Sequence, residues 1–263
     1  MKTICMTLIV LFLTSAGATC KKGMEIIIIA HRGASADNPE NTMIAVKKAL
    51  EYGADYSEID VHQTQDGRII LMHDETLDRT TSGEGYVWDF TWGEIQCLDA
   101  GSWFGEEFQG EPVPALEDII RFVSGRIKLN IEIKISREEP GLVSKVVEII
   151  HKYEFIDKCI VTSFDQKAVE EVRNIDQRIQ TGFIFGKDYP ENVFTGNWDV
   201  LSCNYQIVDE EFVKKARENK KKIYVWTVDE KNEMLRLIDL KVDAIITNRP
   251  GFLVEVMREL NLR

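Results

Sequence analysis

Two carboxylates and a histidine on neighbouring apolar segments are the strongest chemical signal in this sequence. Glu58 and Asp60 lie two residues apart, and His73 follows the next apolar run. Because successive side chains of a β-strand point to opposite faces, Glu58 and Asp60 share one face of a strand. Two carboxylates beside an imidazole can hold a divalent cation and transfer a proton next to it. We expect His62, which follows on the same face, at the protein surface.

The Asp66-Gly67 pair predicts the turn that brings the histidine back to this strand. Asp-Gly between two apolar runs is a strong signal for a two-residue hairpin turn. With that turn, Gln65 would face Arg68. Counting outward from this pair would place His73 opposite Asp60. The sequence therefore predicts an antiparallel hairpin that sets the histidine beside the carboxylates.

The elements that must position these residues alternate along the chain. Short apolar runs are typical of buried parallel strands, and the amphipathic stretches between them are typical of helices. Strands are expected at 25–30, 56–61, 129–135, 159–162, 180–185, 200–203, 223–228 and 244–247. Helices are expected at 42–52, 116–123, 142–153, 166–174, 210–218, 231–240 and 252–260. This alternation predicts an α/β fold, a (β/α)8 TIM-type barrel. The alternative is an open doubly wound sheet, which usually carries a glycine-rich phosphate loop that the sequence lacks.

One stretch, residues 75–113, interrupts the alternation after the second strand. It is too long for an ordinary connection, and its aromatic residues disfavour a disordered linker. We therefore expect one barrel domain over residues 24–263, with an inserted capping segment at about 75–113. Trp103 and Phe104 are expected nearest the mouth of the barrel, with packing inside the segment as an equal alternative.

Polar side chains gather at the carboxyl ends of the predicted strands, where barrel enzymes carry their active sites. The first strand ends in His31 and Arg32, and the third places Asn130, Glu132 and Lys134 on one face. Each group alone fits a solvated strand end. A parallel barrel strand has no face open to water, however, so charges on it need partners. Together these residues predict one site. Later strands end in Ser163-Phe164, Asn204, Trp226-Thr227 and Asn248-Arg249.

Residues 1–20 are expected to be a secretory signal. Lys2 precedes the apolar run 4–13, and residues 16–18 form a small-x-small cleavage site. The run is too short to span a membrane. The segment also resembles a bacterial lipoprotein signal, which would lipidate Cys20, but Thr19 matches that pattern poorly and we favour simple cleavage. In either case we expect an exported protein, periplasmic or a membrane-anchored lipoprotein.

The acidic composition narrows the range of partners. The formal net charge is -12 and the pI is near 4.9. No basic stripe with interleaved aromatic residues is present, so nucleic acid is not an expected partner. An acidic surface also disfavours docking on anionic membranes. A small molecule is the expected partner, and an anionic one would need local positive charges.

In combination and order, the motifs of this chain resemble the glycerophosphodiester phosphodiesterase family. The matching segments are Ala30–Ala34, Asn38–Thr42, Glu58 with Asp60, His73-Asp74, Leu77–Gly83, Leu98–Gly101, Pro114–Glu117, Asn130–Lys134, Val225–Val228 and Thr247-Asn248. The resemblance covers about residues 26–250. The family's own capping segment also follows its second strand. One departure is Asn248, which stands where many members carry aspartate.

The resemblance implies a barrel that hydrolyses glycerophosphodiesters to glycerol 3-phosphate and an alcohol, a reaction of lipid and glycerol metabolism. It also implies a divalent cation, Mg²⁺ or Ca²⁺, held by Glu58, Asp60 and Glu132. Oxygen ligands alone favour such a hard cation over zinc. Two alternatives stay open: a related barrel phospholipase acting on phosphatidylinositol or lysophospholipid, and a non-catalytic phosphodiester-binding protein.

The resemblance also assigns the remaining site residues. His31 and His73 match the acid–base pair of the family. Arg32 and Lys134 match its phosphate-binding residues, and Trp226, inside a matched segment, is expected to contact the substrate.

Overall fold

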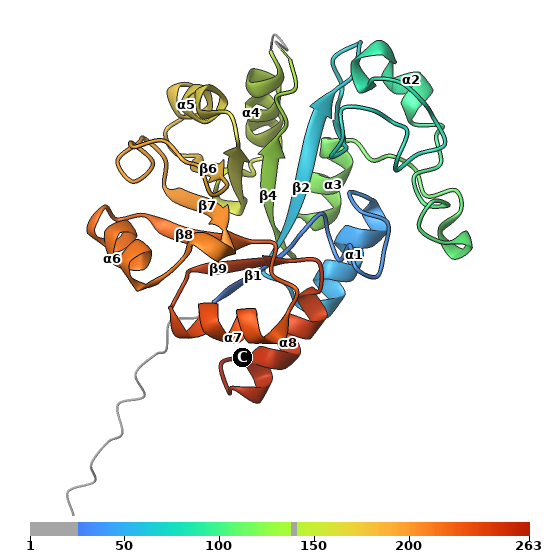
Figure 1. Cartoon of the computed structure of the whole chain (residues 1–263). Helices are drawn as coiled ribbons and strands as arrows, with labels where there is room; N and C mark the ends of the chain where they lie inside the picture. Colours follow the sequence, from blue (N-terminus) through green and yellow to red (C-terminus); the bar gives the residue numbers. More distant parts are fainter. Residues whose placement is uncertain (1–25, 138–140) are drawn as a thin grey trace, which may run out of the picture.

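The computed structural model describes residues 26–137 and 141–263 as a closed barrel surrounded by helices (Figure 1). Its eight parallel strands are β1 (Ile27–Ala30), β2 (Tyr56–Gln63), β4 (Lys128–Ile133), β5 (Cys159–Ser163), β6 (Gln180–Phe185), β7 (Val200–Asn204), β8 (Lys222–Trp226) and β9 (Ala244–Thr247). Because β1 pairs with both β9 and β2, the sheet closes on itself. The predicted (β/α)8 barrel is confirmed, and the open sheet is excluded. The signal predicted at residues 1–20, including Cys20, lies outside the described residues and stays a prediction.

Along the described chain, helices follow every barrel strand except β6 and cover the outside of the barrel. They are α1 (Met43–Tyr52), α3 (Leu116–Val123), α4 (Leu142–Lys152), α5 (Gln166–Ile175), α6 (Glu210–Glu218), α7 (Lys231–Asp239) and α8 (Pro250–Glu259). The side chains of Thr42, Asp165 and Asp209 accept hydrogen bonds from backbone N–H groups in the first turns of α1, α5 and α6, which fixes where these helices begin. Among the described residues, none of the helices has the length and apolar character needed to cross a membrane.

The inside of the barrel is apolar at one end and polar at the other. Ile29, Ile160, Val200, Tyr224 and Ala244 form a buried cluster with Ile246. Because side chains two residues apart share a strand face, the residues that follow on the same face lie one layer closer to the carboxyl ends of the strands. That layer carries the polar groups described below. The apolar layer thus forms the floor of the site.

The strand β3 (Ile69–Leu71) pairs antiparallel with β2, as the hairpin prediction required. The turn, however, is one residue longer than predicted. The N–H of Thr64 donates to the carbonyl of Arg68 (2.9 Å), and that of Gly67 donates to the carbonyl of Thr64 (2.9 Å). Residues 65–67 therefore form the loop, with Gly67 at a φ of 85°. A three-residue hairpin loop places glycine in this left-handed region.

The longer turn changes which residue faces Asp60. The N–H of Met72 donates to the carbonyl of Asp60 (3.1 Å), so Met72 lies opposite Asp60 and the predicted pairing of His73 with Asp60 is wrong. The cause is local: the Thr64 hydroxyl donates to Asp66 Oδ1 (2.6 Å) and accepts from the N–H of Arg68 (2.9 Å). His73 lies beyond the end of β3 and reaches the site from the following loop.

The inserted segment 75–113 contains the short helices η1 (Val87–Asp89), α2 (Trp92–Ile95) and η2 (Glu106–Phe108) and lies beside β2 (Figure 1). Its core combines buried residues of the segment with two from the hairpin: Ile70, Met72, Leu77, Val87, Ile95, Ala100 and Val113. Trp103 is exposed, and its ring packs edge-to-face against that of Phe104. Neither lines the pocket at the barrel mouth in the described part of the chain. The alternative of packing in the core of the segment does not describe Trp103 either, because its side chain is exposed, whereas Phe104 packs against Trp103 and Phe108.

Candidate active site

A pocket opens at the carboxyl ends of the strands and encloses about 540 Å³, including its open mouth. Its lining contains seven of the eight predicted site residues: His31, Arg32, Glu58, His73, Glu132, Lys134 and Trp226. The eighth, Asp60, is only 1% exposed and lies behind them. Asn130, Phe164, Ile184, Ser202, Thr227 and Ile246 complete the lining. The structure thus brings the predicted residues together.

Three carboxylates form one cluster in this pocket, with Glu58 and Asp60 buried and Glu132 half-buried. Asp60 on β2 is the register partner of Glu132 on β4, and Glu58 precedes Asp60 on the same face of β2. One oxygen of each of the three carboxylates lies within 4.8 Å of the others. Glu58 Oε1 is buried and has no hydrogen-bond partner among the described residues. An unpartnered buried carboxylate oxygen in a set of oxygen donors fits a hard divalent cation.

The protonation equilibria of the cluster agree with this fit. Burial raises the pKa of Glu58, and the charges of Asp60 and Glu132 raise it further. Burial and the charge of Asp60 likewise raise the pKa of Glu132. Burial alone would also raise the pKa of Asp60, but Lys134 and Arg32 hold it below its ordinary value. The three carboxylates face only the two positive charges of Lys134 and Arg32, so a net negative charge is left for a cation to offset.

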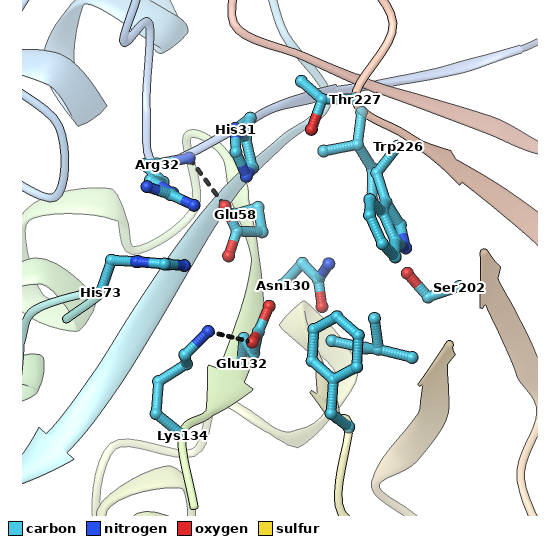
Figure 2. A pocket seen from close by; sticks show the side chains of 13 residues that line it. His31, Arg32, Glu58, His73, Asn130, Glu132, Lys134, Ser202, Trp226 and Thr227 are labelled. Carbon is cyan, nitrogen blue, oxygen red and sulfur yellow. Dashed lines mark hydrogen bonds and ion pairs between the residues drawn. The ribbon is translucent and has the colours of Figure 1, made fainter. Parts of the chain in front are cut away.

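The two cationic residues of the site lie against these carboxylates. Lys134 Nζ is 2.7 Å from Glu132 Oε1 and 3.6 Å from Asp60 Oδ1. Arg32 Nε is 3.4 Å from Asp60 Oδ2. Both side chains also line the pocket, so they place positive charge beside any anion that enters it (Figure 2). This provides the local positive charge that an acidic protein needs to bind an anion.

A tight turn after β1 positions His31 and Arg32. The N–H of Arg32 donates to Glu58 Oε2 (2.7 Å), and Arg32 adopts a φ of 54°. Gly33 follows at a φ of 81°, and a Cβ at this position would lie 2.6 Å from the backbone carbon of Ala45. Glycine is therefore required both by the left-handed backbone and by the close approach of α1. The turn couples the direction of Arg32 to the position of Glu58.

His31 is oriented by a chain of hydrogen bonds that the sequence did not reveal. His31 Nδ1 lies 2.7 Å from Asn248 Oδ1, and Asn248 Nδ2 donates to Asp229 Oδ2 (2.6 Å). A carboxylate only accepts, so the amide of Asn248 must turn its oxygen to His31, and Nδ1 of His31 carries the proton. The other ring nitrogen, Nε2, is then free to accept a proton. Burial, reinforced by the charge of Arg32, lowers the pKa of His31 to about 4 and keeps the ring neutral.

His73 lies on the same side of the pocket as His31 and Arg32, opposite Trp226, and its ring points into the same space (Figure 2). His73 Nδ1 is 2.7 Å from Asp74 Oδ1. Hydrogen bonds from Arg79 and then His73 hold the pKa of Asp74 below its ordinary value, so Asp74 stays an anion. The two histidines thus differ in their partners: a neutral amide for one and a carboxylate for the other.

His62 was expected at the surface, and that prediction is wrong. The side chain is 0% exposed, and its Nε2 is 3.3 Å from the carbonyl oxygen of His73. In the same region, η1 of the inserted segment packs against β2. His62 therefore supports the loop that carries His73 rather than the pocket itself.

An aromatic wall closes the side of the pocket away from the histidines. Trp226 and Phe164 pack edge-to-face with ring centroids 5.7 Å apart, and Phe164 is 52% exposed. The Trp226 indole Nε1 is buried and has no hydrogen-bond partner in the described part of the chain. Sequence patterns located the strand ends that carry Phe164 and Trp226, but not the contact between them, which depends on neighbouring barrel strands.

A TIM barrel whose open end combines a carboxylate cluster, two histidines and two cationic side chains defines a class of protein: a barrel hydrolase for an anionic substrate. Residues 31–252 match the model of the glycerophosphoryl diester phosphodiesterase family. The chain belongs to this family, and its fold and site agree with the motifs that indicated it.

Two named proteins with similar sequences support the assignment of this chain to the family. A glycerophosphodiester phosphodiesterase of Caldanaerobacter subterraneus is 38% identical over 242 residues, which cover 90% of this chain and 99% of the relative. A putative glycerophosphodiester phosphodiesterase of Bacillus subtilis is 34% identical over 241 residues, covering 89% and 99%.

Solved structures agree as well. An Oleispira antarctica phosphodiesterase in complex with the product sn-glycerol-3-phosphate has a TM-score of 0.83 and 27% identity, covering 89% of this chain and 97% of its own. A glycerophosphodiester phosphodiesterase from Agrobacterium tumefaciens has a TM-score of 0.78 and 28% identity, covering 88% and 99%. The chain is thus similar to these phosphodiesterases over nearly their whole length.

Proposed function

We propose that this protein hydrolyses glycerophosphodiesters to glycerol 3-phosphate and an alcohol, and that the reaction depends on a divalent cation. The observation that carries the proposal is the convergence of three clustered carboxylates, two cationic side chains and two differently partnered histidines at one pocket. The glycerol 3-phosphate named in the Oleispira structure supports the choice of substrate class.

Glu58, Asp60 and Glu132 are the residues that would hold the cation, which we propose to be Mg²⁺ or Ca²⁺. Such an ion would offset the charge of the phosphodiester and make its phosphorus easier to attack. Arg32 and Lys134 act on the same group from the protein side. Their positive charges bind the phosphate oxygens and stabilise the negative charge that grows on them in the transition state.

The two histidines divide the proton transfers. Nε2 of His31 accepts the proton of the nucleophile, because its Nδ1 is already committed to Asn248. His73 donates a proton to the departing alkoxide, and its Nδ1 lies against the Asp74 carboxylate, which orients the ring. The nucleophile is the glycerol hydroxyl next to the phosphate, which has a large proximity advantage over free water. Its oxygen bonds to phosphorus as the bond to the alcohol breaks, and the cyclic phosphate is hydrolysed in a second step.

The experiment that tests this function measures glycerol 3-phosphate release from glycerophosphocholine, with and without a chelator. We expect turnover that stops on chelation and returns with added Mg²⁺ or Ca²⁺, because the carboxylate cluster requires a counter-charge. The same assay across several head groups, phosphatidylinositol and lysophospholipid separates the alternatives. Turnover of only the acylated substrates would identify a phospholipase, and binding without turnover would identify a binding protein.

Replacing Asn248 tests the role of His31 as the base. Asn248→Ala should lower kcat roughly 10- to 100-fold, the usual cost of losing a group that orients an active-site histidine. The ring would then be free to rotate and to exchange tautomers. The matched control is Asn204→Ala, because Asn204 ends β7 on the same face but only accepts from the N–H of Gln206. Equal kinetics in the two variants would remove Asn248 from the mechanism.

A further inference from the structure

We propose that Arg79, in the segment inserted after β3, is a positioning residue that holds His73 and Arg32 at a fixed separation at one edge of the pocket. This inference rests on the proposed function. Arg79 is not among the residues that line the pocket in the described part of the chain, and its side chain is 44% exposed. Its effect on the reaction must therefore pass through other residues.

The guanidinium of Arg79 binds two carboxylates at once. Nε donates to Asp74 Oδ2 (2.6 Å) and NH2 to Asp74 Oδ1 (3.1 Å). NH1 donates to Glu40 Oε2 (2.9 Å) and NH2 to Glu40 Oε1 (2.8 Å). Both contacts are bidentate, as is common between the planar guanidinium of arginine and a carboxylate. Bidentate contacts fix the direction of the carboxylate as well as its distance.

Each of these carboxylates continues to a residue of the pocket. Asp74 Oδ1 is the oxygen that lies 2.7 Å from His73 Nδ1, and Glu40 Oε1 is the oxygen that accepts from Arg32 NH1 (2.8 Å). Both oxygens also bind the same nitrogen, NH2 of Arg79. One nitrogen atom therefore sets the spacing between the oxygen that orients the proposed acid and the oxygen that orients a phosphate-binding residue.

The turn that carries Arg79 is well anchored. Leu77 is fully buried in the core of the inserted segment, and its N–H donates to the carbonyl of Gly85 (2.9 Å). Thr80 is also buried, with its hydroxyl 3.2 Å from Met72 Sδ. The backbone that carries Arg79 is therefore ordered. Its side chain loses less conformational freedom on forming four hydrogen bonds than it would on a mobile loop. The inserted segment thus serves the pocket by supporting its edge.

Removal of Arg79 leaves two neighbouring carboxylates without their shared counter-charge. Asp74 and Glu40 then repel each other, and a movement of either one disturbs its contact with His73 or Arg32. His73 and Arg32 would lose their common alignment on the phosphate. A small misplacement of reacting groups can cost about 100-fold in rate. Because the side chain is partly exposed, its loss creates no sealed cavity and should cost little stability.

The test compares Arg79→Ala and Arg79→Lys with the control Arg178→Ala. Arg178 is also exposed and makes three side-chain hydrogen bonds to one carboxylate, Asp176, away from the pocket. We expect Arg79→Ala to lower kcat roughly 10- to 100-fold, with a melting temperature shifted no more than in the control. The kcat of Arg79→Lys should lie between those of the wild type and Arg79→Ala, since the point charge of a lysine cannot bridge both carboxylates.

A second measurement separates positioning from mere folding. If Arg79 acts through Asp74 and His73, its loss should matter less for a nitrophenyl ester of glycerol phosphate than for glycerophosphocholine, because nitrophenolate leaves without a proton. Wild-type kcat in Arg79→Ala, or a loss matched by Arg178→Ala, would overturn the inference while wild-type turnover still supports the proposed function. Absence of glycerol 3-phosphate release by the wild type would overturn both.

Discussion

Replacing His73 with alanine should remove most turnover of glycerophosphocholine and much less turnover of a nitrophenyl ester of glycerol phosphate. A positioned general acid typically contributes 10²- to 10⁴-fold. That contribution is needed when choline leaves as an alkoxide, and it is largely unnecessary when nitrophenolate leaves. The ratio of the two losses, measured as kcat/KM on each ester, therefore reports the proton donor directly.

The paired variant His31→Ala provides the control. If His31 is the base, its loss should be large on both esters, since the nucleophile needs deprotonation in either case. Rescue of His31→Ala by the nitrophenyl ester would reverse the two roles. Equal losses in both variants on both esters would mean that neither ring protonates the leaving group.

Replacing Glu58 with glutamine should have opposite effects on activity and on stability. Activity should fall roughly 100-fold or more, since even outer partners of metal ligands typically contribute 10- to 100-fold. The cation-free protein should melt at a higher temperature, because the change removes one buried charge from a cluster of three mutually repelling charges. The increase in melting temperature on adding Mg²⁺ or Ca²⁺ should shrink at the same time.

Glu117→Gln is the matched control for this variant. Glu117 is also a buried glutamate, but it pairs with Arg68 (3.0 Å) on the outside of the barrel. Its loss should lower the melting temperature and leave the response to cations intact, because a paired charge is removed rather than a repelling one. Full cation-independent activity of Glu58→Gln would exclude the carboxylate cluster as the metal site.

The sequence predicted the barrel well because its signals are local and repeated. The predicted bounds of α3 and α6 match the structure, and most strands agree to within two residues. The site was predictable for a related reason. Charges on a strand that is buried on both faces need an explanation, and Glu58, Asp60, Glu132 and Lys134 all occur on such strands or directly after them.

The sequence-based predictions were wrong where side-chain contacts override local sequence patterns. Asp66-Gly67 indicated a two-residue turn, but the bonds of Thr64 to its neighbours stabilise a longer loop. The partners of the histidines could not be read from spacing either. Asp229 lies 19 residues before Asn248, and Arg79 lies 39 residues after Glu40. Such pairs follow from the way loops of different strands meet at the barrel mouth.

The bond between His31 and Asn248 joins residues 217 positions apart, at the ends of the first and last barrel strands. Those strands are neighbours only after β9 docks beside β1. Contacts between such distant parts of a chain carry a large loop-closure cost and depend on the intervening structure. A chain that has folded every element but not joined its ends would hold the carboxylate cluster on β2 and β4 and still lack an oriented base. Catalytic competence in this protein therefore requires β9 to dock beside β1, and enzyme activity reports that the ring has closed.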